Sequence, residues 1–134
     1  MDGTKILRSV PLAALFAILT AGSASADNWQ ADTRLSVRVR PDSHVTAGTP
    51  IVIRGEMTSD RAWCRRESKL TLRRYNHGVV ARTRTRPDGR YRFEMVARES
   101  MRLRVWFRGK EEGIYPEHHI CLKSRSTTVK INVT

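Results

Sequence analysis

The fold of this chain is decided by one short stretch, Thr85-Arg86-Pro87-Asp88-Gly89-Arg90-Tyr91-Arg92-Phe93. Proline presets φ at the second position of a turn, and glycine accepts the left-handed conformation that closes a three-residue hairpin with a bulge. Basic residues alternate with apolar or hydroxyl residues on both sides of this turn, as in half-buried strands. The stretch therefore predicts a β-hairpin in which residues 81–86 face residues 90–95.

The register of this hairpin, with Arg86 opposite Arg90, sorts its side chains onto two faces. The face expected to enter the core carries Ala81, Thr83, Thr85, Tyr91, Phe93 and Met95. The opposite face carries a single carboxylate, Glu94, together with Arg82, Arg84, Arg86, Arg90 and Arg92. The sequence thus predicts one flat cationic platform on the hairpin.

The same two-residue alternation recurs along the chain, and no stretch keeps a helical period. Alternating segments occupy residues 35–40, 51–54, 70–73, 103–108 and 129–133, with turn residues between them. This pattern predicts an all-β domain of about seven antiparallel strands, arranged as a two-sheet sandwich or a small barrel.

The first 26 residues have the layout of a cleavable secretory signal peptide. Lys5 and Arg8 precede an apolar run over residues 10–19, and small residues follow up to Ala24-Ser25-Ala26. The run is shorter than the roughly 20 residues that span a bilayer, which disfavours a retained membrane anchor. We therefore expect a signal peptide over residues 1–26 and one secreted, monomeric domain over residues 27–134, with no membrane span.

Cys64 and Cys121 both lie in the expected exported part, 57 positions apart. An oxidising compartment favours a disulfide between them. A thiol nucleophile or a metal pair is the alternative, but neither cysteine belongs to a Cys-x-x-Cys pair. We expect the disulfide, and we expect it to tie together two irregular stretches, residues 57–68 and 110–126.

A family resemblance rests on four segments: residues 47–55, the Asp-Gly turn stretch 85–93, residues 103–109, and the closing strand 124–133. Together they resemble the immunoglobulin-like and carboxypeptidase-regulatory-like β-sandwich modules of secreted bacterial proteins. The resemblance implies an immunoglobulin-like sandwich over most of residues 33–133. Such modules serve as spacers, adhesion units or accessory binding domains, so the resemblance implies a role of that kind.

The chain carries 25 lysines and arginines against 13 acidic residues, a net charge of +12. Such a field attracts anionic partners, and guanidinium groups match the oxygens of phosphate, sulfate and carboxylate groups. The arginine platform is thus a candidate polyanion site, with a merely solvated strand face as the alternative. Trp106 lies between Arg104 and Arg108 on an outward face, where it either contacts a ligand or packs beside an arginine stem.

Other chemistry has less support in the sequence. Glu117-His118-His119, close to Cys121, invites a metal interpretation, with His77 as a possible distant ligand. Adjacent histidines can both bind one ion only if the loop folds back, and Cys121 is better used in a disulfide, so we expect no metal site. No catalytic motif with established spacing is present, and no cofactor is expected. We expect a non-enzymatic module that docks on an anionic surface polymer. The alternative is an extracellular protein-interaction module, an inhibitor or adhesion factor, that uses loop residues Trp63, Tyr115 and His118.

Overall fold

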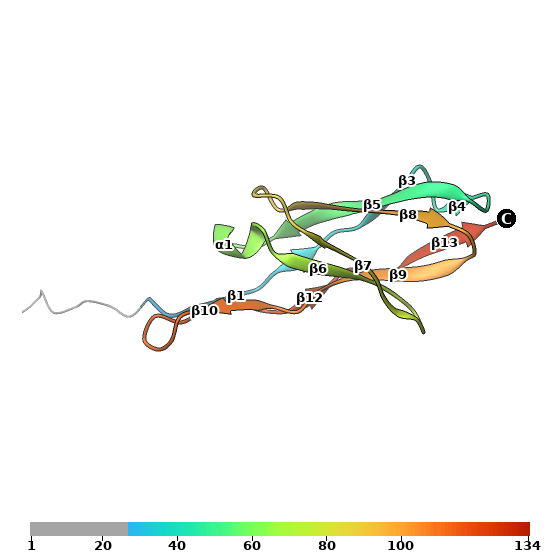
Figure 1. The fold of residues 1–134 in the computed structure, drawn as a ribbon. Helices are drawn as coiled ribbons and strands as arrows, with labels where there is room; N and C mark the ends of the chain where they lie inside the picture. Colours follow the sequence, from blue (N-terminus) through green and yellow to red (C-terminus); the bar gives the residue numbers. More distant parts are fainter. Residues whose placement is uncertain (1–26) are drawn as a thin grey trace, which may run out of the picture.

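The computed structural model describes residues 27–134, and the predicted signal peptide lies outside the described residues. This part of the chain is nearly all β, with 56% of its residues in strands and 4% in one short helix, α1 (Ala62–Arg65). The all-β prediction is confirmed. Figure 1 shows the strands stacked in two layers, with a smaller sheet extending from one end.

The strands form three open sheets. The first layer contains β2 (Arg34–Leu35), β3 (Arg38–Arg40), β5 (Thr49–Thr58) and β8 (Arg90–Ala97). The second contains β4 (His44–Val45), β6 (Lys69–Arg74), β7 (Gly78–Arg84), β9 (Met101–Phe107), β12 (Ser124–Arg125) and β13 (Val129–Val133). The end sheet contains β1 (Trp29–Ala31), β10 (Lys110–Glu112) and β11 (His119–Cys121).

The expectation of about seven antiparallel strands is wrong in two respects. The described residues form thirteen strands, because long alternating segments are interrupted and several two- or three-residue strands pair at the edges. Two pairings, β1 with β11 and β4 with β13, are parallel. These edge pairings involve segments far apart in the sequence, which alternation alone does not specify.

The predicted hairpin register is also wrong beyond its turn. Arg86 N–H donates to the Arg90 carbonyl (2.8 Å), as expected, but β7 then pairs with β6, and β8 pairs along its whole length with β5. The backbone on each side of the turn is already bonded elsewhere: Thr85 N–H donates to Ser68 and Met57 N–H to Gly89. Residues 87–89 therefore carry the chain from one layer to the other.

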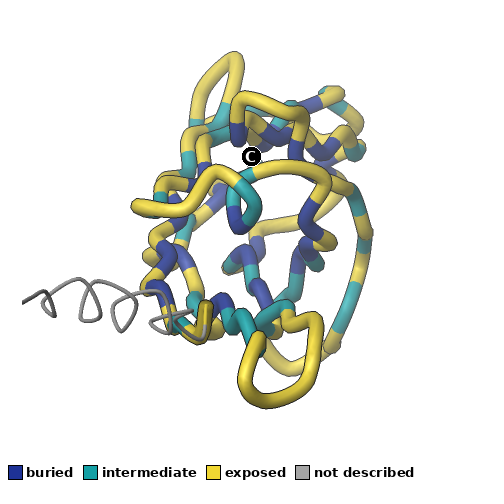
Figure 2. The backbone as a smooth tube through the Cα atoms, turned by 90° about the vertical axis from the view of Figure 1, so that its left-hand side faces the viewer, coloured by how far each residue is buried: buried dark blue, intermediate teal, exposed yellow. Residues whose placement is uncertain are grey.

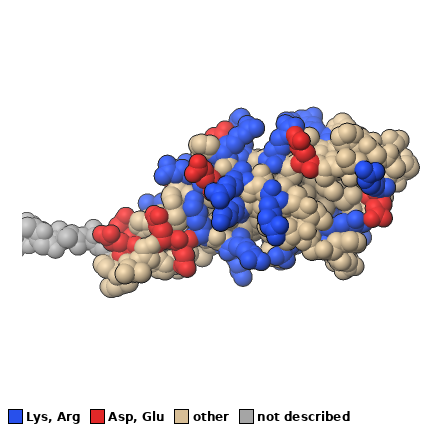
Figure 3. Space-filling model, viewed as in Figure 1, with Lys and Arg blue, Asp and Glu red and all other residues tan. Residues whose placement is uncertain are grey.

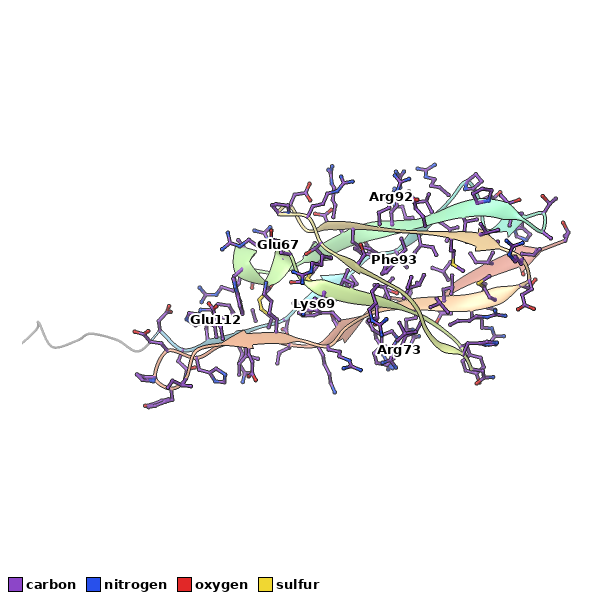
Figure 4. The ribbon with its side chains drawn as sticks, in the orientation of Figure 1. Glu67, Lys69, Arg73, Arg92, Phe93 and Glu112 are labelled. Atoms are coloured by element: carbon purple, nitrogen blue, oxygen red, sulfur yellow. A yellow bond between two sulfur atoms is a disulfide. The ribbon has the colours of Figure 1, made fainter. Side chains whose placement is uncertain are left out.

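The core lies between the two layers. Tyr91 and Phe93 are each 3% exposed, so the expected core face of β8 is confirmed. Figure 4 places Phe93 between the layers, and in Figure 2 buried positions recur along the strands on both sides of the interior. Large apolar side chains that are fully buried come from both layers: Ile51, Ile53, Met57, Leu70, Leu72, Leu103, Val105, Phe107 and Ile131.

The expected disulfide is confirmed. Cys64 and Cys121 are bonded, their Cα atoms lie 5.7 Å apart, and both are buried. The bond joins α1 to β11 and so attaches the end sheet to the two-layer body. Loop-closure entropy over this separation corresponds to about 4 kcal/mol of stabilisation.

Gly89 should be the most sensitive position of the crossover turn. Its φ is +93°, and a Cβ atom there would lie 2.5 Å from the Met57 carbonyl oxygen. We expect Gly89→Ala to lower the free energy of unfolding by about 2 to 4 kcal/mol, because strain and overpacking add. Gly78 has a φ of +83° with open space around it, so Gly78→Ala is the matched control and should cost about 1 kcal/mol. Equal losses in urea denaturation would contradict the crowding at Gly89.

Tyr91 should make stability depend on alkaline pH. Its hydroxyl donates to the Ser36 carbonyl, and burial raises its pKa well above the ordinary 10.0. Its contribution is fully present below pH 10 and is lost as the pH rises further, because only the unfolded state ionises readily. We expect Tyr91→Phe to cost about 1 to 2 kcal/mol near neutral pH and to flatten this alkaline loss. A Tyr75→Phe control, altered at an exposed tyrosine, should follow the wild type in denaturation from pH 7 to 11.

Candidate functional site

Alternation on β9 and β6 places a set of polar side chains on the outer side of the second layer. Leu103, Val105 and Phe107 are buried, so Arg104, Trp106 and their neighbours turn outward. The same holds on β6, where Leu70 and Leu72 face the core. We call the outer side of β6, β7, β9, β12 and β13 the Trp106 face.

The strand register places Trp106 at the centre of a row. Trp106 lies opposite Thr71 on β6 and opposite Arg125 on β12, and Thr71 in turn lies opposite Arg82 on β7. The next outward row pairs Arg73 with Arg104. The tryptophan is therefore surrounded by arginines from four different strands.

Two of these arginines lie over the indole ring. The guanidinium carbon of Arg73 is 4.8 Å from the ring centroid, and that of Arg125 is 5.4 Å away. They come from β6 and β12, on opposite sides of β9. Such cation–π contacts contribute about 0.5 to 2 kcal/mol each. Of the two interpretations of Trp106, the structure shows the packing one: the ring holds guanidinium groups in place.

Three polar atoms around Trp106 lack hydrogen-bond partners among the described residues. Thr71 Oγ1 and the Nε atoms of Arg73 and Arg104 are buried without a partner among the described residues. Arg104 does donate from Nη2 to Thr128 Oγ1 (2.9 Å). Burying an unpaired donor of a charged group is costly, and a nearby anion lowers that cost electrostatically.

The charge on the Trp106 face is one-sided. Its strands present these cations outward or just beyond their ends: Lys69, Arg73, Arg82, Arg84, Arg102, Arg104, Arg108, Arg125 and Lys130. Within residues 27–134, none of them forms an ion pair with a carboxylate, whereas Arg74, Arg90 and Arg92 do. In Figure 3, basic side chains gather over the middle of the molecule, and several acidic ones gather at the end where β10 lies.

Shallow hollows flank the tryptophan on this face. One is lined by side chains of β6, β7 and β9, including Thr71, Arg82 and Arg84. The other lies toward β12 and is lined by Arg73, Lys123 and Arg125. Both are open to solvent and lined by cations, so an extended anionic chain could lie across them.

The five arginines predicted to form one platform are all exposed, but they do not share a face. Arg82 and Arg84 belong to the Trp106 face, Arg86 lies in the crossover turn, and Arg90 and Arg92 lie on the outer side of the first layer. Figure 4 shows Arg92 and Arg73 on opposite sides of the molecule. The platform expected from the hairpin is therefore divided, because its two strands join different sheets.

The disulfide-tied segments form a second cluster, where α1 meets the end sheet. Trp63 packs edge-on against Trp29 (centroids 6.1 Å apart), and Trp29 stacks on His119 at 4.8 Å. Of the predicted contact residues, Trp63 is thus half-buried, while Tyr115 is 79% exposed. His118 Nε2 lies 3.0 Å from Glu111 Oε2.

Lys110 joins this cluster, which sequence reasoning did not foresee. Its Nζ donates to the carbonyl oxygens of Trp63 (2.6 Å) and Arg66 (2.9 Å) and lies 4.4 Å from the Trp63 ring centroid. Burial lowers the pKa of Lys110, and the charge of Arg66 lowers it further. The lysine secures the loop after α1 against the end sheet.

The histidines lie beside carboxylates, but not in an arrangement that could hold a metal ion within residues 27–134. His118 faces Glu111, and His119 lies between Asp27 (3.1 Å) and Glu112 (3.6 Å). In the described part of the chain, no group of three or more histidine, cysteine or acidic side chains is arranged to hold a metal ion.

Sequence reasoning missed Arg73 and Arg125 as partners of Trp106. Arg73 carried a usable signal, because it continues the outward series of Lys69 and Thr71. Arg125 carried none, since β12 has only two residues and its pairing with β9 is a tertiary contact.

Comparison with protein-family models gives no match to this chain, and comparison with curated proteins gives none. Across residues 27–134, no helix is both long and apolar enough to cross a bilayer.

Trp106 should stabilise the fold through its arginines. We expect Trp106→Ala to lower the free energy of unfolding by about 1 to 3 kcal/mol, because two cation–π contacts and ring packing are lost. The matched control is Tyr75→Ala, which removes a 67% exposed ring whose one arginine is 5.9 Å away and should cost under about 1 kcal/mol. A Trp106→Ala protein as stable as wild type in urea denaturation would show that the ring does not hold the arginines.

Proposed function

We propose that this chain is an exported, non-enzymatic binding module that docks on an anionic polymer through the Trp106 face. One observation carries the proposal: lysines and arginines crowd that face, and within the described residues only Arg74, at the end of β6, is paired with a carboxylate. The partner class is a polymer bearing phosphate, sulfate or carboxylate groups at the outside of a cell.

The energetics of the face favour a ligand. Like charges directly opposite each other on a sheet, such as Arg73 and Arg104, destabilise it by a few tenths of a kcal/mol or more. Anionic groups from a ligand turn this repulsion into attraction. Guanidinium forks can bind such oxygens bidentately, and the field of the face speeds encounter at low salt.

The arginine stacking on Trp106 narrows the binding mode. Proteins that bind single-stranded nucleic acid offer free aromatic rings on which bases stack. Here guanidinium groups already lie over the ring, so the ligand meets cations first. The proposed ligand is therefore recognised by its density of negative charge rather than by stacking.

The proposal includes an immunoglobulin-like fold and export from the cell. We assign the two-layer body to the immunoglobulin-like sandwich modules, an assignment supported by the opposed sheets and by the segments that resemble such modules. Export is supported by the signal-peptide pattern of residues 1–26 and by the disulfide, which persists in oxidising compartments.

A second candidate function rests on the loop between β10 and β11. Ile114 and Tyr115 there are 82% and 79% exposed, side by side at the tip. Adjacent exposed apolar side chains are anchor candidates for a protein partner. This surface is separate from the Trp106 face, so the two functions respond to different substitutions.

Retention on a heparin column tests the main proposal. We expect Arg82→Ser, Arg84→Ser and Arg108→Ser, combined, to elute at markedly lower salt than wild type, because each lost phosphate- or sulfate-type contact reduces counterion release. These residues are exposed and outside the Trp106 stack, so the fold should persist, as circular dichroism would verify.

The matched control removes the same charge from loops: Arg66→Ser, Arg86→Ser and Arg98→Ser. It should elute close to wild type. Equal shifts in both triple variants would mean that net charge alone drives retention and would remove the Trp106 face as a site. Ile114→Ser with Tyr115→Ala should leave elution unchanged, and a strong shift there would favour the loop instead.

A further inference from the structure

We propose that the outer side of the first layer is a second anion-binding face, so that one domain bridges two stretches of anionic polymer. The inference rests on the proposed function, because it assigns the same ligand class to both faces. It is carried by a different set of residues and by the opposed placement of the two faces.

The second face is built on three neighbouring strands. Arg38 on β3 lies opposite Arg54 on β5, and Arg54 lies opposite Arg92 on β8. All three side chains are exposed, because their neighbours Ile53 and Phe93 face the core. We call these three residues the arginine row.

Repulsion within the arginine row destabilises the protein when no ligand is bound. Adjacent strands are about 4.8 Å apart, so the Cβ atoms of directly opposite arginines lie close together and their like charges repel. Arg92 is offset by Glu94, with Nη2 to Oε1 at 2.7 Å. Arg38 and Arg54 have no carboxylate partner among residues 27–134. Two unpaired guanidinium groups directly opposite each other are suited to a shared oxyanion.

The second face is less cationic than the first. Arg40 and Arg90 extend the row, but Glu56 lies opposite Arg90, and Asp88 Oδ2 lies 3.7 Å from Arg90 Nε. We therefore expect the arginine row to bind more weakly than the Trp106 face. The arginine row becomes occupied when the polymer is abundant, or when the Trp106 face is already bound to polymer.

The two faces cannot serve one straight stretch of polymer. The core separates them, and Figure 4 shows Arg92 and Arg73 pointing away from each other on opposite sides. Packed sheets lie about 10 Å apart, and side chains add to that distance on each side. A chain lying along one face must wrap round an edge to reach the other, so the second face meets a second stretch. The domain then acts as a cross-linker.

Stoichiometry and light scattering test this inference. The probes are a short heparin oligosaccharide, too short to wrap the domain, and full-length heparin. We expect wild type to bind two oligosaccharides in calorimetric titration and to raise the scattering of full-length heparin. Arg38→Ser, Arg54→Ser and Arg92→Ser, combined, should bind one oligosaccharide, lose the scattering, and still be retained on the heparin column.

The loop variant with Arg66→Ser, Arg86→Ser and Arg98→Ser again removes equal charge and should behave as wild type in both assays. A wild type that binds a single oligosaccharide, or a row variant that still scatters, overturns bridging and leaves the Trp106 face standing. A row variant that no longer binds any oligosaccharide overturns the Trp106 face as the main site, and bridging with it. Circular dichroism of each variant ensures that losses reflect binding rather than unfolding.

Discussion

Burial of one side of every long strand between two layers is the constraint on which the structure depends. Ile53 and Phe93 from one layer meet Leu72 and Val105 from the other, and each is almost fully removed from water. Apolar burial contributes about 25 cal/mol for each Å². Because side chains alternate strictly, the same burial forces the intervening residues outward. Those residues are largely arginines, so a basic exterior on both layers follows from the way the core is built.

The protein manages this crowding of cations differently on its two outer faces. On the first layer, carboxylates offset part of the charge, as Glu94 does for Arg92. On the second, Glu99 pairs with Arg74, but around Trp106 the aromatic ring takes that role, because it lies between Arg73 and Arg125. A ring stabilises a guanidinium group without cancelling its charge. The Trp106 face therefore remains strongly positive while its side chains are ordered, which is the property expected of a prepared anion-binding surface.

Two connections hold the parts in place. The turn at Gly89 passes the chain from the second layer to the first, packed against the Met57 carbonyl. Beside this turn, whose Gly89 lies next to Arg65 of α1, the Cys64–Cys121 bond and Lys110 attach α1 to the end sheet, where acidic residues pair with His118 and His119. Several carboxylates gather at the end sheet (Figure 3), and on the outer side of the second layer the pair of Arg74 with Glu99 leaves the arginines around Trp106 without acidic partners among the described residues.

The sequence by itself determined the strand class, the side of each strand that enters the core, and the disulfide, because alternation and cysteine usage are local or pairwise properties. Tyr91 and Phe93 could be placed inside, and Arg90 and Arg92 outside, without knowing the neighbouring strands. Only the tertiary structure decided which strands are neighbours. Pro87-Asp88-Gly89 closes a turn equally well within one sheet or between two. The difference lies in two backbone hydrogen bonds to residues distant in sequence: Thr85 N–H donates to the Ser68 carbonyl, and Met57 N–H donates to the Gly89 carbonyl. That choice sends Arg84 and Arg92 to opposite faces, and the separate pairing of β12 with β9 brings Arg125 beside Trp106. Both depend on partner strands that the local pattern does not specify.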